Sequence, residues 1–249
     1  MPRSHKSLPR LYVEPDLAVR TIVHLDRDQS NYLAAVLRKQ VGDEAVLFNG
    51  RDGAWLCRIV VDAKKNVVLE VIEQIALQPA PTDLWYGFAP LKSARLDYVI
   101  QKATEMGAGT IQPVTTQFTQ VHRINMDKVT ANAIEAAEQC EVLTVPAVSP
   151  EITLEKLITT WAETHSARKL IFADEGEGAS SPVETLQALK GAPLGLLIGP
   201  EGGFSDEERA KLRAQPFVVP ISLGPRILRA DTAAVAALAL IQAIIGDWR

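Results

Sequence analysis

The sequence predicts an α/β protein in two parts, a small β barrel followed by a larger domain built around a mainly parallel sheet. Short strand-like runs dominate residues 10–75, whereas strand-like and helical patterns alternate after residue 84. A proline-rich stretch at residues 78–83 separates the two regions. We therefore expect a β domain over residues 1–75, a linker over 76–83 and an α/β domain over 84–249.

The first region contains apolar runs typical of strands at residues 11–13, 21–25, 44–48, 55–61 and 67–71. Turn-forming residues separate several of them, at residues 49–53 and 64–66. One helical pattern, over about residues 28–39, interrupts the runs. A chain of 249 residues with 47% hydrophobic residues can bury a sizeable core, in one or two domains.

In the second region, strands are predicted over residues 84–88, 110–114, 169–173, 194–198 and 218–223. The first helix follows a stripe of apolar residues from Leu96 to Met106 and ends at Gly107. Further helices are predicted over residues 126–140, 154–166 and 182–189, and from Asp231 or Thr232 to about Ile245. Because strands and helices alternate, we expect a mainly parallel sheet.

The most informative stretch follows the apolar run at residues 194–198. It reads Gly199-Pro200-Glu201-Gly202-Gly203-Phe204-Ser205. Its glycines leave main-chain amides and carbonyls open to a flat ligand. Ser205 and Glu208 form an S-x-x-E capping box, which fixes the start of the next helix. A bare strand-to-helix turn would also explain these residues.

A second loop of the same kind follows the run at residues 218–223. It reads Leu223-Gly224-Pro225-Arg226-Ile227-Leu228-Arg229-Ala230-Asp231-Thr232-Ala233. Asp231 or Thr232 is expected to cap the helix that follows. A turn does not need two arginines, and their apolar neighbours indicate that Arg226 or Arg229 points into a pocket. We expect the two loops to lie side by side at one sheet edge and to form a ligand site.

Several classes of function find no support in the sequence. The patterns G-x-G-x-x-G and G-x-x-x-x-G-K-[ST] are absent, so neither a Rossmann dinucleotide site nor a P-loop is indicated. Cys57 and Cys140 stand far apart and the histidines are scattered, so we expect neither a disulfide nor a metal site. The longest apolar stretch, residues 233–241, is too short to cross a membrane, and no secretory signal is visible. We expect a cytoplasmic protein.

The net charge of −4 is distributed unevenly. Residues 1–75 hold 11 Lys or Arg against 10 Asp or Glu, whereas residues 76–249 carry a net charge of −5. Arg3, Lys6 and Arg10 meet no carboxylate within the first ten residues and form a small basic arm. Such an arm is either a frayed terminus or a source of phosphate contacts, which need local rather than global positive charge.

The two loop motifs resemble those of the SPOUT methyltransferases, specifically the 16S ribosomal RNA uridine N3-methyltransferases of the RsmE type. The resemblance extends over essentially the whole chain. Upstream it is carried by Arg10-Leu11-Tyr12-Val13, Val36-Leu37-Arg38, Gln101-Lys102-Ala103-Thr104-Glu105-Met106-Gly107 and Glu135-Ala136-Ala137-Glu138-Gln139-Cys140. The chain departs from the pattern at two places. Residues 141–146 lack the arginine that the family carries there, and Asp231 replaces a glutamate.

The resemblance implies a PUA-like RNA-binding domain, a C-terminal SPOUT domain with a trefoil knot, and a homodimer. It also implies S-adenosylmethionine as the methyl donor and N3 of a uridine as the acceptor, in 16S ribosomal RNA or the small ribosomal subunit. Two other functions remain open. The same fold could methylate another acceptor, such as a ribose 2′-hydroxyl or a transfer RNA base, or the protein could be a non-catalytic RNA-binding assembly factor.

Specific residues acquire expected roles from this resemblance. Cofactor contacts are expected from Leu197, Ile198, Gly199, Pro200, Glu201, Gly202, Leu223, Gly224, Ile227, Leu228 and Thr232. RNA contacts are expected from Arg3, Lys6, Arg10, Arg38, Lys92 and Lys102. Arg229 is expected beside the reacting groups, where its cation would stabilise the uracil anion that forms as N3 loses its proton. We identify no general base and no metal ligand.

Overall fold

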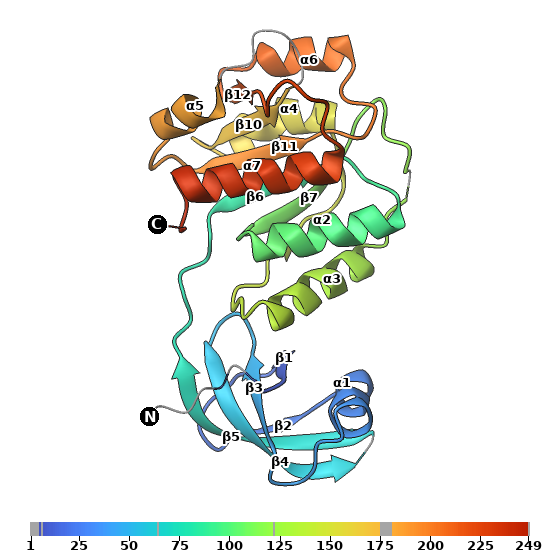
Figure 1. Ribbon diagram of the computed structural model, residues 1–249, viewed down its shortest axis with the longest axis vertical. Helices are drawn as coiled ribbons and strands as arrows, with labels where there is room; N and C mark the ends of the chain where they lie inside the picture. The colour runs from blue at the N-terminus through green and yellow to red at the C-terminus, as the bar shows by residue number, and fades with distance from the viewer. Residues whose placement is uncertain (1–4, 6, 64, 122, 175–180, 249) are drawn as a thin grey trace. The chain divides into compact units, whose positions relative to one another are not determined.

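The computed structural model describes residues 5, 7–63, 65–121, 123–174 and 181–248. Its contacts divide the chain into two compact units, whose elements are labelled in Figure 1. The N-terminal unit comprises Met1–Pro81 and Ala137–Val145, and the C-terminal unit comprises Thr82–Ala136 and Pro146–Arg249. The first division falls within the stretch expected to be a linker.

The N-terminal unit is built on one mixed sheet with the strand order β1-β3-β4-β5-β2. Its strands are β1 (Arg10–Tyr12), β2 (Ile22–His24), β3 (Glu44–Phe48), β4 (Ala54–Ala63) and β5 (Asn66–Ala76). β1 pairs with β3 in parallel, and the other pairs are antiparallel. Each strand expected in this region is therefore present. β5 runs five residues beyond the predicted end at Val71.

The core of this unit is formed by residues of its strands and of the helical segment after β2. Its buried members include Leu11, Val23, Leu33, Leu47, Cys57, Ile59 and Leu69. Helix α1 (Arg27–Asn31) begins where the Asp26 side chain accepts a hydrogen bond from the Gln29 amide. A π-helical segment, η1 (Tyr32–Val36), follows directly.

The single helix predicted over residues 28–39 is therefore wrong in extent. The Leu37 amide donates to the carbonyl of Tyr32, five residues back, so the α-helical ladder is interrupted. Arg38 then adopts a left-handed φ of 56°, which ends the helical path. Apolar periodicity did not reveal this change, because it does not record which carbonyl each amide bonds to.

A segment distant in sequence completes the N-terminal unit. The end of helix α3 (Met126–Gln139) and the loop after it, Ala137–Val145, belong to this unit. The Tyr12 amide donates to Glu138 Oε1 at 2.8 Å, and Gln78 Nε2 donates to the carbonyl of Leu143 at 3.3 Å. No periodicity in the sequence predicts this association, because it joins residues more than sixty positions apart.

The C-terminal unit is built on a parallel sheet with the order β12-β10-β11-β6-β7-β8. The strands are β6 (Leu84–Phe88), β7 (Thr110–Thr115), β8 (Ala147–Val148), β9 (Ile152–Thr153), β10 (Lys169–Ala173), β11 (Leu194–Ile198) and β12 (Val218–Ile221); β9 pairs with β7. The pairs within this sheet are parallel, which confirms the expectation. β8 and β9 were not predicted, because two residues are too few to show a period.

Helices alternate with these strands along the chain. They are α2 (Ser93–Glu105), α3 (Met126–Gln139), α4 (Leu154–Thr164), α5 (Pro182–Ala188), α6 (Asp206–Arg213) and α7 (Ala230–Ile244). α7 lies across β11 and contacts α2 and α5 (Figure 1). On α4, Trp161 is fully buried and meets Trp85 edge-on at 5.1 Å. The buried residues of β11 fit a strand covered on both faces. The trefoil knot stays a prediction.

The start of α7 differs from the expected one. The helix begins at Ala230, with Arg229 at the N-cap position, so neither Asp231 nor Thr232 is the cap. Asp231 lies instead in the first turn, where its charge interacts favourably with the unpaired amides of the helix start. The cap prediction was wrong because acidic residues favour both positions.

Candidate functional site

The order in which the chain adds strands to the sheet changes direction at β10. The chain places β11 on one side of β10 and then returns to place β12 on the other side. β11 pairs with one edge of β10 and β12 with the other, so the carboxyl ends of these strands lie in a row. In open parallel sheets, ligands bind at such reversals, outside the carboxyl ends of the strands. A cavity lies there, lined by Ala173 and Asp174, by residues from the end of β11 to α6, by residues 223–228, and by Ala230 and Ala233. The two loops thus share one cavity, although β10 separates their strands.

Most of the expected cofactor residues line this cavity. They are Ile198, Gly199, Pro200, Leu223, Gly224, Ile227 and Leu228. Among the described residues, the other four lie outside the lining. Leu197 is buried in the core, Glu201 pairs with Arg95 at 3.0 Å, and Thr232 is exposed on α7. Gly202 is exposed and lies close to Phe118.

The first loop is shaped by two glycines. A Cβ atom on Gly199 would lie 2.6 Å from the ring of Phe204, so a larger residue would force a shift in the wall. Gly203 has a φ of 70°, which glycine adopts without strain, and its amide donates to the Pro200 carbonyl at 2.9 Å. The capping box is confirmed, since Ser205 and Glu208 exchange both hydrogen bonds.

The second loop is more open. Gly224 has a φ of 106°, and its amide donates to Ser222 Oγ at 3.2 Å. Ile227 lines the cavity and is nevertheless 86% exposed. Arg226 is exposed and lines the cavity. Arg229 is exposed at the start of α7 and lies outside the lining. The structure therefore places one of the two loop arginines at the cavity and the other just beyond it.

A buried carboxylate at the floor of the cavity was missed by sequence reasoning. The Asp174 side chain is completely buried, and its Oδ2 lies 2.6 Å from Arg213 Nη2. Its Oδ1 lies 3.8 Å from Nε of Arg209, which lines the cavity. The cavity thus combines apolar side chains, main-chain atoms and the Arg209 guanidinium, which lies near the Asp174 carboxylate. The sequence offered two signals for this pair. One was a polar residue directly after a buried strand, and the other was two arginines four positions apart in the stretch that forms α6.

The expected RNA contacts of the first 75 residues occupy different settings. Arg10 belongs to β1 rather than to an arm, and its guanidinium lies 5.7 Å from the centre of the Phe48 ring. Burial lowers the pKa of Arg10 from its ordinary value. Arg38 is exposed. Arg3 and Lys6 lie outside the described residues.

The other two expected RNA contacts lie at α2. Lys92 is exposed at the N-cap position of the helix. Lys102 pairs with Glu105 at 2.7 Å, and its Nζ lies 5.6 Å from the centre of the Tyr98 ring. Lys92 is therefore the more accessible of the two to a phosphate.

Within the described ranges, no group of three or more His, Cys, Asp and Glu side chains is arranged to hold a metal ion. In the same part of the chain, no helix combines the length and apolar character needed to cross a membrane.

Two family models match the chain. One describes an RNA methyltransferase domain and covers residues 78–242, and the other describes an RNA methyltransferase PUA domain and covers residues 25–72. The fold and the cavity at the strand ends thus define an RNA methyltransferase preceded by a PUA domain.

Individual relatives narrow the class. Ribosomal RNA small subunit methyltransferase E of Rickettsia conorii is 32% identical over 94% of both chains. The crystal structure of the Neisseria gonorrhoeae protein of that name, bound to S-adenosylmethionine, superposes with a TM-score of 0.86 at 27% identity, covering 97% of this chain and 100% of that one. A Legionella pneumophila protein in complex with the same cofactor gives a TM-score of 0.83 at 28% identity, covering 95% and 97%. The chain belongs to the family of the ribosomal RNA small subunit methyltransferases E, which confirms the resemblance drawn from the loop motifs.

Proposed function

We propose that this protein transfers a methyl group from S-adenosylmethionine to N3 of a uridine in the 16S ribosomal RNA of the small ribosomal subunit. The observation that carries the proposal is the cavity where both glycine-containing loops meet at the ends of β10, β11 and β12. The relatives from Neisseria gonorrhoeae and Legionella pneumophila, solved with S-adenosylmethionine, support the choice of cofactor.

The residues at the cavity suit this cofactor. Ile198, Leu223 and Leu228 offer apolar surface for a flat base, and the main chain at Gly199 and Gly203 lies open to it. The ring of Phe204 lines the same cavity and leaves no room for a side chain at Gly199. We assign the remaining contacts to the main chain of Leu197, Glu201 and Gly202 and to Thr232.

The bound cofactor supplies a methyl group that is already activated by a positively charged sulfur. What remains for the protein is to position the acceptor and to favour loss of the N3 proton. We assign the second task to Arg229, because a fixed cation beside the uracil stabilises the anion as it forms. Arg229 directly follows the cavity-lining residues of the second loop.

The active form we propose is a homodimer with its C-terminal units in contact. Ile227 is 86% exposed although it borders the cavity, and a partner subunit would cover this apolar side chain. The proposed location is the cytoplasm, because the proposed substrate is ribosomal RNA. Light scattering at micromolar concentration should give the mass of two chains, and the mass of one chain would contradict the homodimer.

The reaction is tested on small ribosomal subunits from a strain that lacks the protein. After incubation with labelled S-adenosylmethionine, mass analysis of the digested RNA should identify 3-methyluridine. A methyl group on a ribose 2′-hydroxyl, or on transfer RNA alone, would assign another acceptor to the same fold. Absence of transfer to any RNA would favour a non-catalytic assembly factor.

A further inference from the structure

We propose that Glu208 is a positioning residue for methyl transfer, because its carboxylate ties the turn after β7 to the loop that borders the cofactor cavity. The inference rests on the proposed assignment of that cavity to S-adenosylmethionine. It adds a residue that lies outside the cavity lining and acts through the main chain of two loops.

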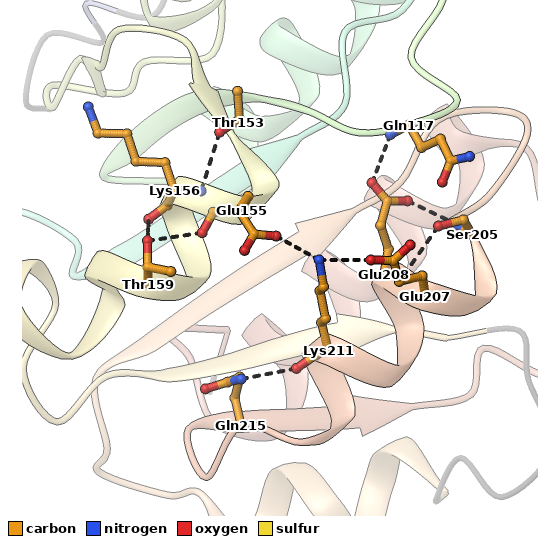
Figure 2. Close-up of polar contacts among 10 residues, drawn as sticks. All are labelled: Gln117, Thr153, Glu155, Lys156, Thr159, Ser205, Glu207, Glu208, Lys211 and Gln215. Atoms are coloured by element: carbon orange, nitrogen blue, oxygen red, sulfur yellow. Dashed lines mark hydrogen bonds and ion pairs between the residues drawn. The ribbon is translucent and has the colours of Figure 1, made fainter.

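Both oxygens of Glu208 accept main-chain hydrogen bonds, as Figure 2 shows. Oε2 accepts from the Ser205 amide at 3.0 Å, which is the ordinary return bond of a capping box. Oε1 accepts from the Gln117 amide at 2.7 Å, which the capping box does not require. One carboxylate therefore joins the start of α6 to a segment about ninety positions earlier in the chain.

The turn held in this way is itself well ordered by hydrogen bonds. The Thr116 amide donates to Thr119 Oγ1 at 2.9 Å, and the Thr119 amide donates to the Thr116 carbonyl at 3.1 Å. Both threonines are buried. Glu208 thus links the loop of residues 199–205, here called the cofactor loop, to a turn that has hydrogen bonds of its own.

The turn also lies close to the cofactor loop at a second point. Phe118 lies so close to Gly202 that a Cβ added there would be 3.2 Å from the Phe118 Cβ. Gly202 stands next to Gly203, which lines the cavity. Loss of the Glu208 bond to Gln117 would release the turn, and with it the support behind this part of the loop.

Glu208→Gln is the informative change, because a glutamine offers one acceptor oxygen where the carboxylate offers two. We expect the Kd and KM for S-adenosylmethionine to rise about tenfold, as for the loss of one charge-assisted hydrogen bond. kcat at saturating cofactor should change little, since Glu208 does not touch the reacting atoms. Hydrogen exchange at the Gln117 amide should accelerate in the folded protein.

Figure 2 also draws Glu207 and Thr153, the two residues changed in the control variants. Glu207→Gln alters the neighbouring carboxylate, which pairs with Lys211 at 3.0 Å, and should leave both cofactor affinity and exchange at Gln117 unchanged. Thr153→Ala removes a capping bond to the Lys156 amide from α4 and should lower stability without changing cofactor affinity.

A variant at the other contact keeps the proposal testable if Glu208→Gln folds poorly. Phe118→Ala leaves the capping box intact and should raise the KM for the cofactor in the same way. Normal affinity in Glu208→Gln together with slow exchange at Gln117 would overturn the role of Glu208. An equal loss of affinity in Thr153→Ala would overturn it too, because the effect would then be general destabilisation. If the wild-type protein did not bind S-adenosylmethionine, the assignment of the cavity itself would fail.

Discussion

Arginines only three positions apart in the second loop have different relations to the cavity. Arg226 contributes to its wall, whereas Arg229 caps α7 and stands beside it. A cation in the wall acts on whatever the cavity holds, and a cation beside it can act on a group that approaches from outside. We therefore propose that Arg226 acts on the cofactor and Arg229 on the acceptor.

This difference predicts distinct kinetic effects. Arg229→Ala should lower the rate of methyl transfer by roughly 10² to 10³ with little change in cofactor affinity, as for the loss of one electrostatic contact to the transition state. Arg226→Ala should mainly weaken cofactor binding. Single-turnover rates and calorimetry separate the two effects. Wild-type turnover with lost cofactor binding in Arg229→Ala would show that Arg229 has another role.

At the scale of helices and strands, the sequence predicted most elements from apolar runs bounded by turn residues. It predicted the two loops because glycines and a capping box leave a local pattern. The sequence could not predict that Asp174 lines the same cavity as the two loops, because that depends on β10 lying between β11 and β12. Strand order arises from contacts between distant residues, and no local pattern records it.

The interior of β4 predicts selective thiol chemistry. Cys57 is fully buried, and burial raises the pKa of its thiol to about 12, whereas Cys140 is exposed. Because the thiolate is the reactive form, a maleimide at about pH 8 should label Cys140 rapidly and Cys57 only after unfolding. Mass spectrometry of the native protein should show one adduct, on Cys140. Rapid labelling of Cys57 in the native state would contradict the packing of β4.

The aromatic stack on α4 predicts a pH dependence of stability. The His165 ring stacks on Trp161 at 4.0 Å, and burial, with a smaller contribution from Arg168, lowers the pKa of His165. Because the pKa of His165 is lower in the folded state, the folded protein favours the neutral ring. This contribution to the free energy of unfolding is fully present above a pH of about 6.5, the ordinary pKa of histidine. It is lost as the pH falls through the pKa of the folded state.

The matched variant is His165→Phe, which keeps a ring at the stack and cannot be protonated. Between about pH 7.5 and pH 5, the Tm of the wild type should fall more than that of His165→Phe. Parallel curves for the two proteins would show that His165 does not contribute to the acid sensitivity of the domain.

For the whole molecule, the division of the chain into a β unit and an α/β unit was visible in the sequence, because the spacing of apolar residues changes at the proline-rich stretch. The proposed tasks follow this division only in part, because the expected RNA contacts Lys92 and Lys102 lie at α2 in the C-terminal unit. The cavity belongs to the C-terminal unit, and Arg10 and Arg38 belong to the N-terminal unit. RNA affinity should therefore be changeable without any effect on cofactor affinity.

Arg38→Asn tests this separation with little strain, because asparagine tolerates the left-handed φ of 56° found at this position. The change should weaken binding to ribosomal RNA and lower the log-log salt slope by about one unit if Arg38 contacts one phosphate. Arg20→Asn is the matched control, since Arg20 is also exposed and has a φ of 69°. Equal losses in both variants would indicate a nonspecific charge effect.

The attachment of Ala137–Val145 to the N-terminal unit bears on synthesis and on gene exchange. Domains generally fold as units in the order of their synthesis. Here the ribosome completes β5 well before it reaches Val145. The N-terminal unit therefore cannot reach its final form until residues 137–145 have been made. A gene fusion cut at Pro81 would likewise separate the unit from the strip of chain that completes it. Recombination that replaces the N-terminal unit of this protein would therefore have to exchange two separate stretches of its gene together.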